Sequence, residues 1–106
     1  MAGHPLSIGV MLLSAMRDAG PRFGRFTKAV EQAETLGFDA VWTGNSYALG
    51  GPDPFQMLVH AASITEKLHF GTSVFLLPMR HPTTTALEVA SLDQLSGGRF
   101  LFGVGV

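Results

Sequence analysis

The chain has 106 residues, the length of a single domain, and 46% of them are apolar, which is enough for a packed core and excludes an intrinsically disordered chain. Seven Lys and Arg residues nearly balance eight Asp and Glu residues, and no basic run occurs, so we expect no nucleic-acid partner and no binding to an anionic membrane. Cysteine is absent, which excludes disulfides and thiolate chemistry.

The N-terminal stretch, residues 1–16, contains an apolar run but lacks the basic segment that begins a signal peptide. No segment reaches the roughly 18 apolar residues of a membrane span. Because the chain also lacks cysteine, which fits a reducing compartment, we expect a cytoplasmic protein.

The first predicted strand is Leu6–Leu13, which is apolar at nearly every position, as expected for a strand covered on both faces. A helix is predicted from about Phe23 to Leu36, and Gly37 ends it. Its apolar positions recur at helical spacing and predict a buried face of Phe26, Val30, Ala33 and Leu36/Gly37. A second strand is predicted over Ala40–Thr43.

The next helix has a strong start signal. Asp53 is predicted as the N-cap, Pro54 as the first helical residue and Gln56 as the partner in a capping box. The helix is predicted to run to about Thr65, and a third strand follows over about Leu68–Leu77. The residues predicted to be buried on this helix are Leu58, Ala61, Ala62 and Thr65.

A third helix is predicted from about Thr84 to Leu95, with Leu87, Ala90 and Leu95 among its buried positions, and a fourth strand over Arg99–Val104. Strands that alternate with helices at intervals of about thirty residues predict right-handed crossovers and a parallel sheet, hence an α/β fold. Either a doubly wound sheet or part of an eight-stranded barrel satisfies this pattern.

The doubly wound alternative predicts a glycine-rich phosphate-binding turn directly after the first strand. Residues 14–24 read SAMRDAGPRFG, which is no such turn. Residues 103–105 form half of such a fingerprint, but no helix follows them. The pattern therefore favours the barrel.

Five segments are distinctive together: Glu34–Trp42 (ETLGFDAVW), Asp53-Pro54, Gly71–Val74 (GTSV), Arg80-His81-Pro82 and Leu92–Arg99 (LDQLSGGR). In this order and spacing they resemble the N-terminal part of the luciferase-like monooxygenases, in the branch that includes deazaflavin (F-420) dependent oxidoreductases. The resemblance implies a TIM-like barrel. Four strands and three helices are about half of it, so residues 1–106 are expected to form a truncated domain of this family.

The resemblance also implies a flavin-type cofactor, coenzyme F-420 or FMN, and a small-molecule substrate. In the family a bulge in the third strand contains a cis peptide bond, and its backbone supports one face of the cofactor ring. The matching bond is Ser73–Val74, so Thr72, Ser73 and Val74 are expected to bind the cofactor. From the residues alone, Thr72 and Ser73 are expected merely to satisfy a strand edge.

The end of the second strand is the next candidate, because the carboxyl ends of barrel strands carry the active site. Many deazaflavin enzymes have an Asp-His pair there, whereas this chain has Asn45 and Ser46. Neither side chain titrates near neutral pH. They are expected to orient a substrate or a ring carbonyl by hydrogen bonding, which argues against a sugar-phosphate dehydrogenase type of mechanism.

Arg80 and His81 follow the third strand and lie at the same expected end of the barrel. Arg80 is predicted to contact an anionic cofactor tail or substrate, and His81 to act as a titratable donor. The alternative is that both are solvated or pair with neighbouring carboxylates. Trp42 points either to the core or to the ring pocket.

The remaining polar residues have weaker claims. His60 and His69 are expected to be packing or surface residues, and no spacing indicates a metal site. Asp39, Asp93 and Arg99 lie at the opposite end of the barrel, where charge pairing is structural.

Two hypotheses about function therefore remain open: a flavin- or deazaflavin-dependent oxidoreductase, and a non-catalytic truncated module that binds no cofactor by itself. The first and fourth strands would have no partner within this chain. Since both are apolar, we also expect self-association through these open sheet edges.

Overall fold

The computed structural model describes residues 6–44 and 50–106, apart from the side chain of Ser14. Strands and helices alternate along the chain. The order is β1 (Gly9–Met11), α1 (Leu13–Arg17), the 3-10 turn η1 (Pro21–Phe23), α2 (Gly24–Leu36), β2 (Ala40–Thr43), α3 (Pro54–Ile64), β3 (His69–Leu76), the 3-10 turn η2 (Leu77–Met79), α4 (Pro82–Ser96) and β4 (Phe100–Gly105).

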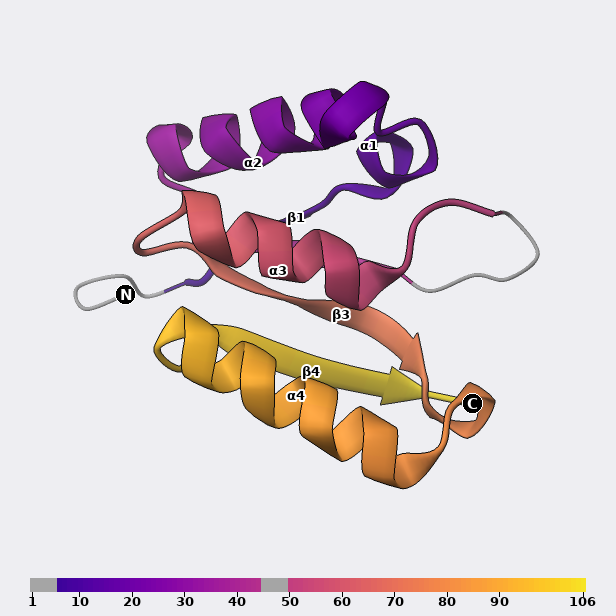
Figure 1. Ribbon diagram of the computed structural model, residues 1–106. Helices are drawn as coiled ribbons and strands as arrows, with labels where there is room; N and C mark the ends of the chain where they lie inside the picture. Colours follow the sequence, from indigo (N-terminus) through magenta and orange to yellow (C-terminus); the bar gives the residue numbers. More distant parts are fainter. Residues whose placement is uncertain (1–5, 45–49) are drawn as a thin grey trace.

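The four strands form one parallel sheet in the order β1-β2-β3-β4. The helices α2, α3 and α4 lie along one face of this sheet (Figure 1). Each helix connects two neighbouring parallel strands, so the predicted α/β fold is confirmed. Because side chains alternate between the two faces of a strand, half of them point away from these helices.

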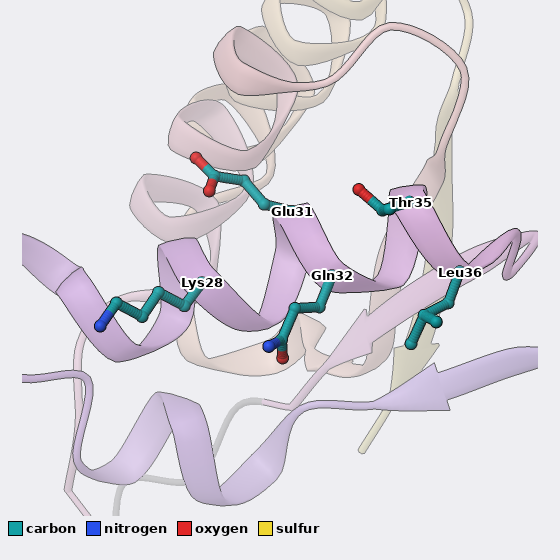
Figure 2. A pocket seen from close by; sticks show the side chains of 5 residues that line it. All are labelled: Lys28, Glu31, Gln32, Thr35 and Leu36. Carbon is teal, nitrogen blue, oxygen red and sulfur yellow. The ribbon is translucent and has the colours of Figure 1, made fainter.

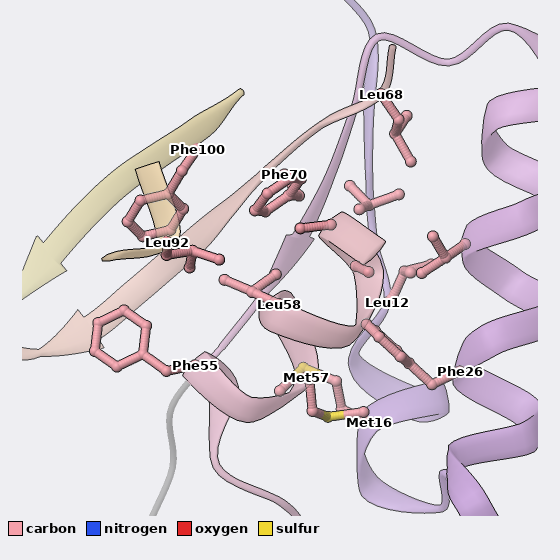
Figure 3. Close-up of a cluster of buried hydrophobic side chains, with 14 of the residues drawn as sticks. Leu12, Met16, Phe26, Phe55, Met57, Leu58, Leu68, Phe70, Leu92 and Phe100 are labelled. Atoms are coloured by element: carbon pink, nitrogen blue, oxygen red, sulfur yellow. The ribbon is translucent and has the colours of Figure 1, made fainter. Parts of the chain in front are cut away.

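The core fills the space between the helices and the sheet (Figure 3). Its fully buried side chains include Phe26, Met57, Leu58, Phe70 and Leu92. Aromatic rings dominate the part between α3 and the last two strands, where the ring centroids of Phe55 and Phe75 are 4.7 Å apart. Offset and tilted ring pairs of this kind stabilise a core beyond the area that they bury.

The helix ends follow the local sequence signals. The carboxylate of Asp53 accepts a hydrogen bond from the backbone N–H of Gln56, which confirms the predicted cap of α3. Gly37 and Gly97 end α2 and α4 in the left-handed conformation that glycine adopts at low cost. The predicted buried face of α3 is also confirmed. On α2, Phe26, Val30 and Ala33 are buried as predicted, but Leu36 in the last turn is 74% exposed.

The first predicted strand is too long. Only Gly9–Met11 form β1, and the chain enters helix α1 at Leu13. The apolar run changes its period here, because Leu12 and Met16 are four positions apart and both are buried. The backbone N–H of Met16 bonds to the carbonyl of Leu12, as in a helical turn.

The predicted buried face of α4 is wrong. Leu87 and Leu95 are 69% and 56% exposed, and Ala90 is exposed as well. The helix instead buries Thr85, Leu92 and Ser96. Apolar residues occur on several sides of α4, so their spacing does not select one face.

The amino ends of the strands are held by hydrogen bonds of Arg99 and Asp39, mostly with backbone groups. Arg99 donates to the carbonyls of Ala62, Leu68 and Ser96 and to the hydroxyl of Thr65. The carboxylate of Asp39 accepts from the backbone N–H of Ile8. Both residues have structural contacts, as predicted, but their hydrogen-bond partners are backbone groups and a hydroxyl. The charge of Arg99 also acts on the carboxylate of Glu34.

The face of the sheet that points away from the helices carries partly exposed apolar side chains, among them Met11, Val74 and Leu101. At the edges of the sheet, β1 and β4 each pair with one neighbour among the described strands. Within the described residues, none of the helices is long and apolar enough to cross a membrane.

Candidate functional site

Regular pairing between β3 and β4 is interrupted near the carboxyl end of the sheet. Three steps along β3, from Thr72 to Phe75, match two steps along β4, from Phe102 to Val104. The extra residue makes a β-bulge, a feature that re-aims side chains and is frequent beside active sites. The peptide bond between Ser73 and Val74 is cis, as the family resemblance implies.

The bulge presents two exposed residues. Ser73 is exposed and Val74 is 40% exposed, although both belong to the longest strand of the sheet. The flanking residues Thr72 and Phe75 are fully buried. The bulge therefore offers a short stretch of accessible backbone on an otherwise buried strand.

The side chain of Thr72 faces away from this surface and is fully buried. Its hydroxyl donates to the carbonyl of Gly103 over 2.8 Å, and the backbone N–H of Gly103 donates to the same hydroxyl over 3.1 Å. The sequence-based expectation that Thr72 touches the cofactor thus concerns its backbone, because the hydroxyl is engaged within the sheet.

Glycines surround the bulge. A Cβ atom at Gly103 would lie 2.2 Å from the carbonyl oxygen of Thr72, and one at Gly105 would lie 2.6 Å from a methyl group of Val74. On the β2 side, a Cβ at Gly44 would lie 3.4 Å from the carbonyl oxygen of Ser73. Neighbouring strands thus approach the bulge so closely that side chains at Gly103 and Gly105 would clash.

Trp42 lies on the same face of the sheet, one row below the bulge. It is in register with Met11 and Gly71, and its neighbours Val41 and Thr43 are buried on the helix side. A Cβ at Gly71 would lie 2.7 Å from the indole ring, and one at Gly9 would lie 2.6 Å from its Nε1 atom. The indole therefore lies against the sheet, outside the helix-side core.

Arg80 lies in the helix layer. Its guanidinium forms ion pairs with the carboxylates of Asp53 and Glu88, and it lies over the rings of Phe55 and Phe75, 5.4 and 4.9 Å from their centroids. Pairing with neighbouring carboxylates, one of the two alternatives from the sequence, is thus present. Contact with an anionic cofactor or substrate stays a prediction.

His81 is the N-cap of α4, and its Nδ1 atom accepts the backbone N–H of Thr83 over 3.1 Å. Its side chain is exposed, and its catalytic role stays a prediction. Asn45 and Ser46 lie outside the described residues. His60 bonds to the hydroxyl of Thr27 over 2.6 Å between two helices, which agrees with the packing role predicted for it.

A groove of about 530 Å³ lies between α3 and α4 and is lined by Phe55, Gln56, Val59, Leu87, Glu88, Ser91, Leu92 and Leu95. Two further grooves lie beside α4 and along α2. One, of about 550 Å³, runs beside the N-terminus of α4 and is lined by Leu77, Pro78, Arg80, Pro82, Thr85, Ala86, Val89 and Phe102. The other, of about 530 Å³, lies along α2 (Figure 2) and is lined by Lys28, Glu31, Gln32, Thr35 and Leu36. Because all residues of the groove along α2 come from one helix, it lacks the convergent polar groups of a ligand site.

Sequence reasoning missed the glycines as part of this site. Gly103 and Gly105 counted only as half of a phosphate-binding fingerprint. A usable signal was present, since glycine inside a strand indicates a bulge or the close approach of another backbone. What the sequence could not show is which backbone approaches, because Thr72 and Gly103 are far apart along the chain.

The luciferase-like monooxygenase family model matches residues 7–106. A Mycobacterium tuberculosis protein named as a coenzyme F-420-dependent oxidoreductase is 42% identical over 77 residues, which cover 73% of this chain and 21% of that protein. Limonene 1,2-monooxygenase of Rhodococcus erythropolis is 36% identical over 92 residues, covering 83% of this chain and 24% of that protein.

Solved structures show the same relationship. The oxygenating constituent of 3,6-diketocamphane monooxygenase from Pseudomonas putida, in complex with FMN, is 25% identical with a TM-score of 0.81, covering 94% of this chain and 29% of that one. The coenzyme F-420 dependent tetrahydromethanopterin reductase of Methanopyrus kandleri is 31% identical with a TM-score of 0.79, covering 94% and 27%. The chain thus spans about a quarter of the length of these relatives.

Proposed function

The chain belongs to the luciferase-like monooxygenase family. We propose that it functions as the N-terminal portion of a flavin-dependent or deazaflavin-dependent oxidoreductase, and that it holds the cofactor ring at the bulge of β3. The observation that carries this proposal is the exposure of Ser73 and Val74 at the carboxyl end of a parallel sheet, the end at which barrel enzymes place their active sites.

The residues around the bulge fit a planar ring. Side chains at Gly103 and Gly105 would clash with the bulge, so the surface beside Val74 is formed largely by backbone. A flat, partly apolar ring fits such a surface, since few side chains stand between it and the backbone. FMN is bound in one relative and F-420 is named for another, so both cofactors are candidates.

The cofactor, when bound, supplies the hydride or oxygen chemistry, and the protein holds the ring and controls access to it. In our proposal Ser73 and Val74 support the ring through their backbone. Asn45 and Ser46 orient the ring or a small-molecule substrate by hydrogen bonds, and His81 is a titratable proton donor. Arg80 reaches an anionic group of the cofactor or substrate only if it loosens one of its two ion pairs.

Titration of the full chain with FMN and with F-420 tests the proposal. Trp42 is the chain's one tryptophan, so its fluorescence reports on ligands at this face. We expect weak, saturable quenching by at least one cofactor, and loss of this binding in Val74→Glu, which places a charge where the ring is proposed to lie. Val59→Glu is the matched control, because Val59 on α3 is 41% exposed, almost the same as Val74 at 40%. Equal binding by both variants would overturn the proposed site.

The second candidate function is a module that binds no cofactor by itself. The observation in its favour is coverage, because the chain matches only 21–24% of the relatives whose sequences are described above. Absence of any saturable binding by the unmodified chain, with either cofactor, would support this candidate.

A further inference from the structure

The bulge in β3 needs something to hold β4 in place where the regular backbone pairing stops. Register is regular from Phe70 to Thr72 and resumes at Phe75, so the hydrogen-bond ladder has a break opposite Gly103. A break of this kind leaves backbone donors and acceptors unpaired, and buried backbone groups must find other partners.

The hydroxyl of Thr72 supplies both partners. It accepts the N–H of Gly103 over 3.1 Å and donates to the carbonyl of Gly103 over 2.8 Å. One hydroxyl can do both, because it has one donor hydrogen and two acceptor lone pairs. A buried side chain thus bonds both backbone polar groups of Gly103, at the residue where the regular register stops.

Gly103 is the matching half of this arrangement. The carbonyl oxygen of Thr72 occupies the space of a side chain at position 103, since a Cβ there would lie only 2.2 Å from it. Backbone atoms cannot move aside as the end of a flexible side chain can. The contact therefore requires glycine at 103, and the hydroxyl at 72 then bonds both polar backbone groups of that glycine.

From these contacts we infer that Thr72 and Gly103 are a positioning pair, which fixes the register of the bulge and thereby the placement of Ser73 and Val74 on the open face. Neither residue is a catalytic residue in this inference, since neither needs to touch the cofactor with its side chain. The consequence for the cofactor rests on the proposed function, whereas the consequence for the register does not.

Thr43 offers a matched control. It is also a fully buried threonine in a neighbouring strand, but its hydroxyl makes only a long contact of 3.4 Å, to the carbonyl of Gly71. Thr72→Val and Thr43→Val each exchange a hydroxyl for a methyl group of similar size. If only the burial of a threonine matters, the two substitutions have similar effects on the bulge. If Thr72 and Gly103 position the bulge, only Thr72→Val changes the register of the bulge.

The first measurement is amide hydrogen exchange of the full chain. In the unmodified chain we expect the Gly103 amide to be protected although the ladder is broken there. We expect Thr72→Val to raise its exchange rate by about tenfold, the size of effect of one lost hydrogen bond. Thr72→Ser keeps the hydroxyl and should restore most of the protection, and Thr43→Val should leave it unchanged. Fast exchange of the Gly103 amide in the unmodified chain would overturn the inference. This test does not depend on whether any variant folds.

The second measurement is binding of FMN and F-420 by the same variants, followed by Trp42 fluorescence. We expect Thr72→Val to weaken binding by about tenfold and Thr72→Ser to restore it, since the ring surface follows the register of the bulge. Unchanged binding in Thr72→Val, together with faster exchange at Gly103, would overturn the link to the cofactor and leave the proposed function intact. If the unmodified chain binds neither cofactor, the proposed function fails, and the exchange data alone decide whether Thr72 and Gly103 fix the bulge.

Discussion

The guanidinium of Arg80 binds the carboxylate of Asp53, and that same carboxylate caps the first turn of α3. Arg80 also binds Glu88 of α4 over 3.1 Å. One side chain from the loop after β3 thus joins the N-cap of α3 to the middle of α4. Removal of the Arg80 side chain should therefore affect the stability of the fold.

We expect Arg80→Ala to lower the free energy of unfolding by about 1–3 kcal/mol, because it leaves two partly buried carboxylates without their partner. If Arg80 were instead free for a ligand, its removal would cost little stability. Urea denaturation at fixed protein concentration measures the change.

Arg25→Ala is the control for this substitution. Arg25 also forms an ion pair with an aspartate, Asp18, but the two side chains are 65% and 75% exposed. Exposed pairs contribute about 0–1 kcal/mol, so this variant should stay close to the unmodified chain. An equally small effect of Arg80→Ala would show that its ion pairs do not hold the helices.

The second prediction concerns the carboxylate of Glu34, which accepts the backbone N–H groups of Glu66, Lys67 and Leu68. Partial burial by itself would raise the pKa of this carboxyl, but the three donors and the charge of Arg99 outweigh it, so the pKa lies below its ordinary value of 4.5. A lowered pKa in the folded state means that the ionised form stabilises the fold. This contribution is complete above pH 4.5 and is lost as the pH falls through the lower folded-state pKa.

Urea midpoints measured from neutral pH down to acid therefore separate two glutamates of the same helix. Glu34→Gln should lower stability at neutral pH and flatten the decline below the ordinary carboxyl range. Glu31→Gln should do neither, since Glu31 is exposed on α2. If the pH profiles of the two variants coincide, the three backbone hydrogen bonds do not depend on the charge of Glu34.

The third prediction concerns Gly71, which lets Trp42 lie against the sheet. A Cβ at this position would lie 2.4 Å from the carbonyl oxygen of Leu101 and 2.7 Å from the indole ring. We expect Gly71→Ala to destabilise the fold by about 1–3 kcal/mol, as overpacking does, and to shift the emission of Trp42.

Gly24→Ala is the control, because Gly24 has helical dihedral angles and no atom within 4 Å of the added methyl group. It should be neutral or slightly stabilising, since alanine favours a helix more than glycine does. A neutral Gly71→Ala with unchanged emission would mean that the indole does not rest on this strand.

The parts of the fold that the sequence predicted well depend on neighbours in the chain. β2 was predicted with its observed bounds, and the cap of α3 was predicted to the residue, because an N-cap and its partner lie within one turn. The face of α4 was mispredicted because α3 and β4 determine which side is buried, and an apolar pattern spread around the helix does not reveal them. The Thr72–Gly103 contact likewise depends on the pairing of two strands, which no local pattern records.

The last prediction concerns the edges of the sheet. β1 and β4 are its outer strands, and Val104 of β4 is 49% exposed. Unpaired edges that are apolar and lack charged residues or proline act as templates for other strands. We propose that the 106-residue chain self-associates through these edges or is only marginally folded, and that it shows no turnover with FMN or F-420. Sedimentation over a range of concentrations should give masses above the monomer, and Val104→Lys should shift them towards the monomer. Leu87→Lys, on the outer side of α4, should not. A stable monomer that unfolds cooperatively and binds either cofactor tightly would refute this prediction.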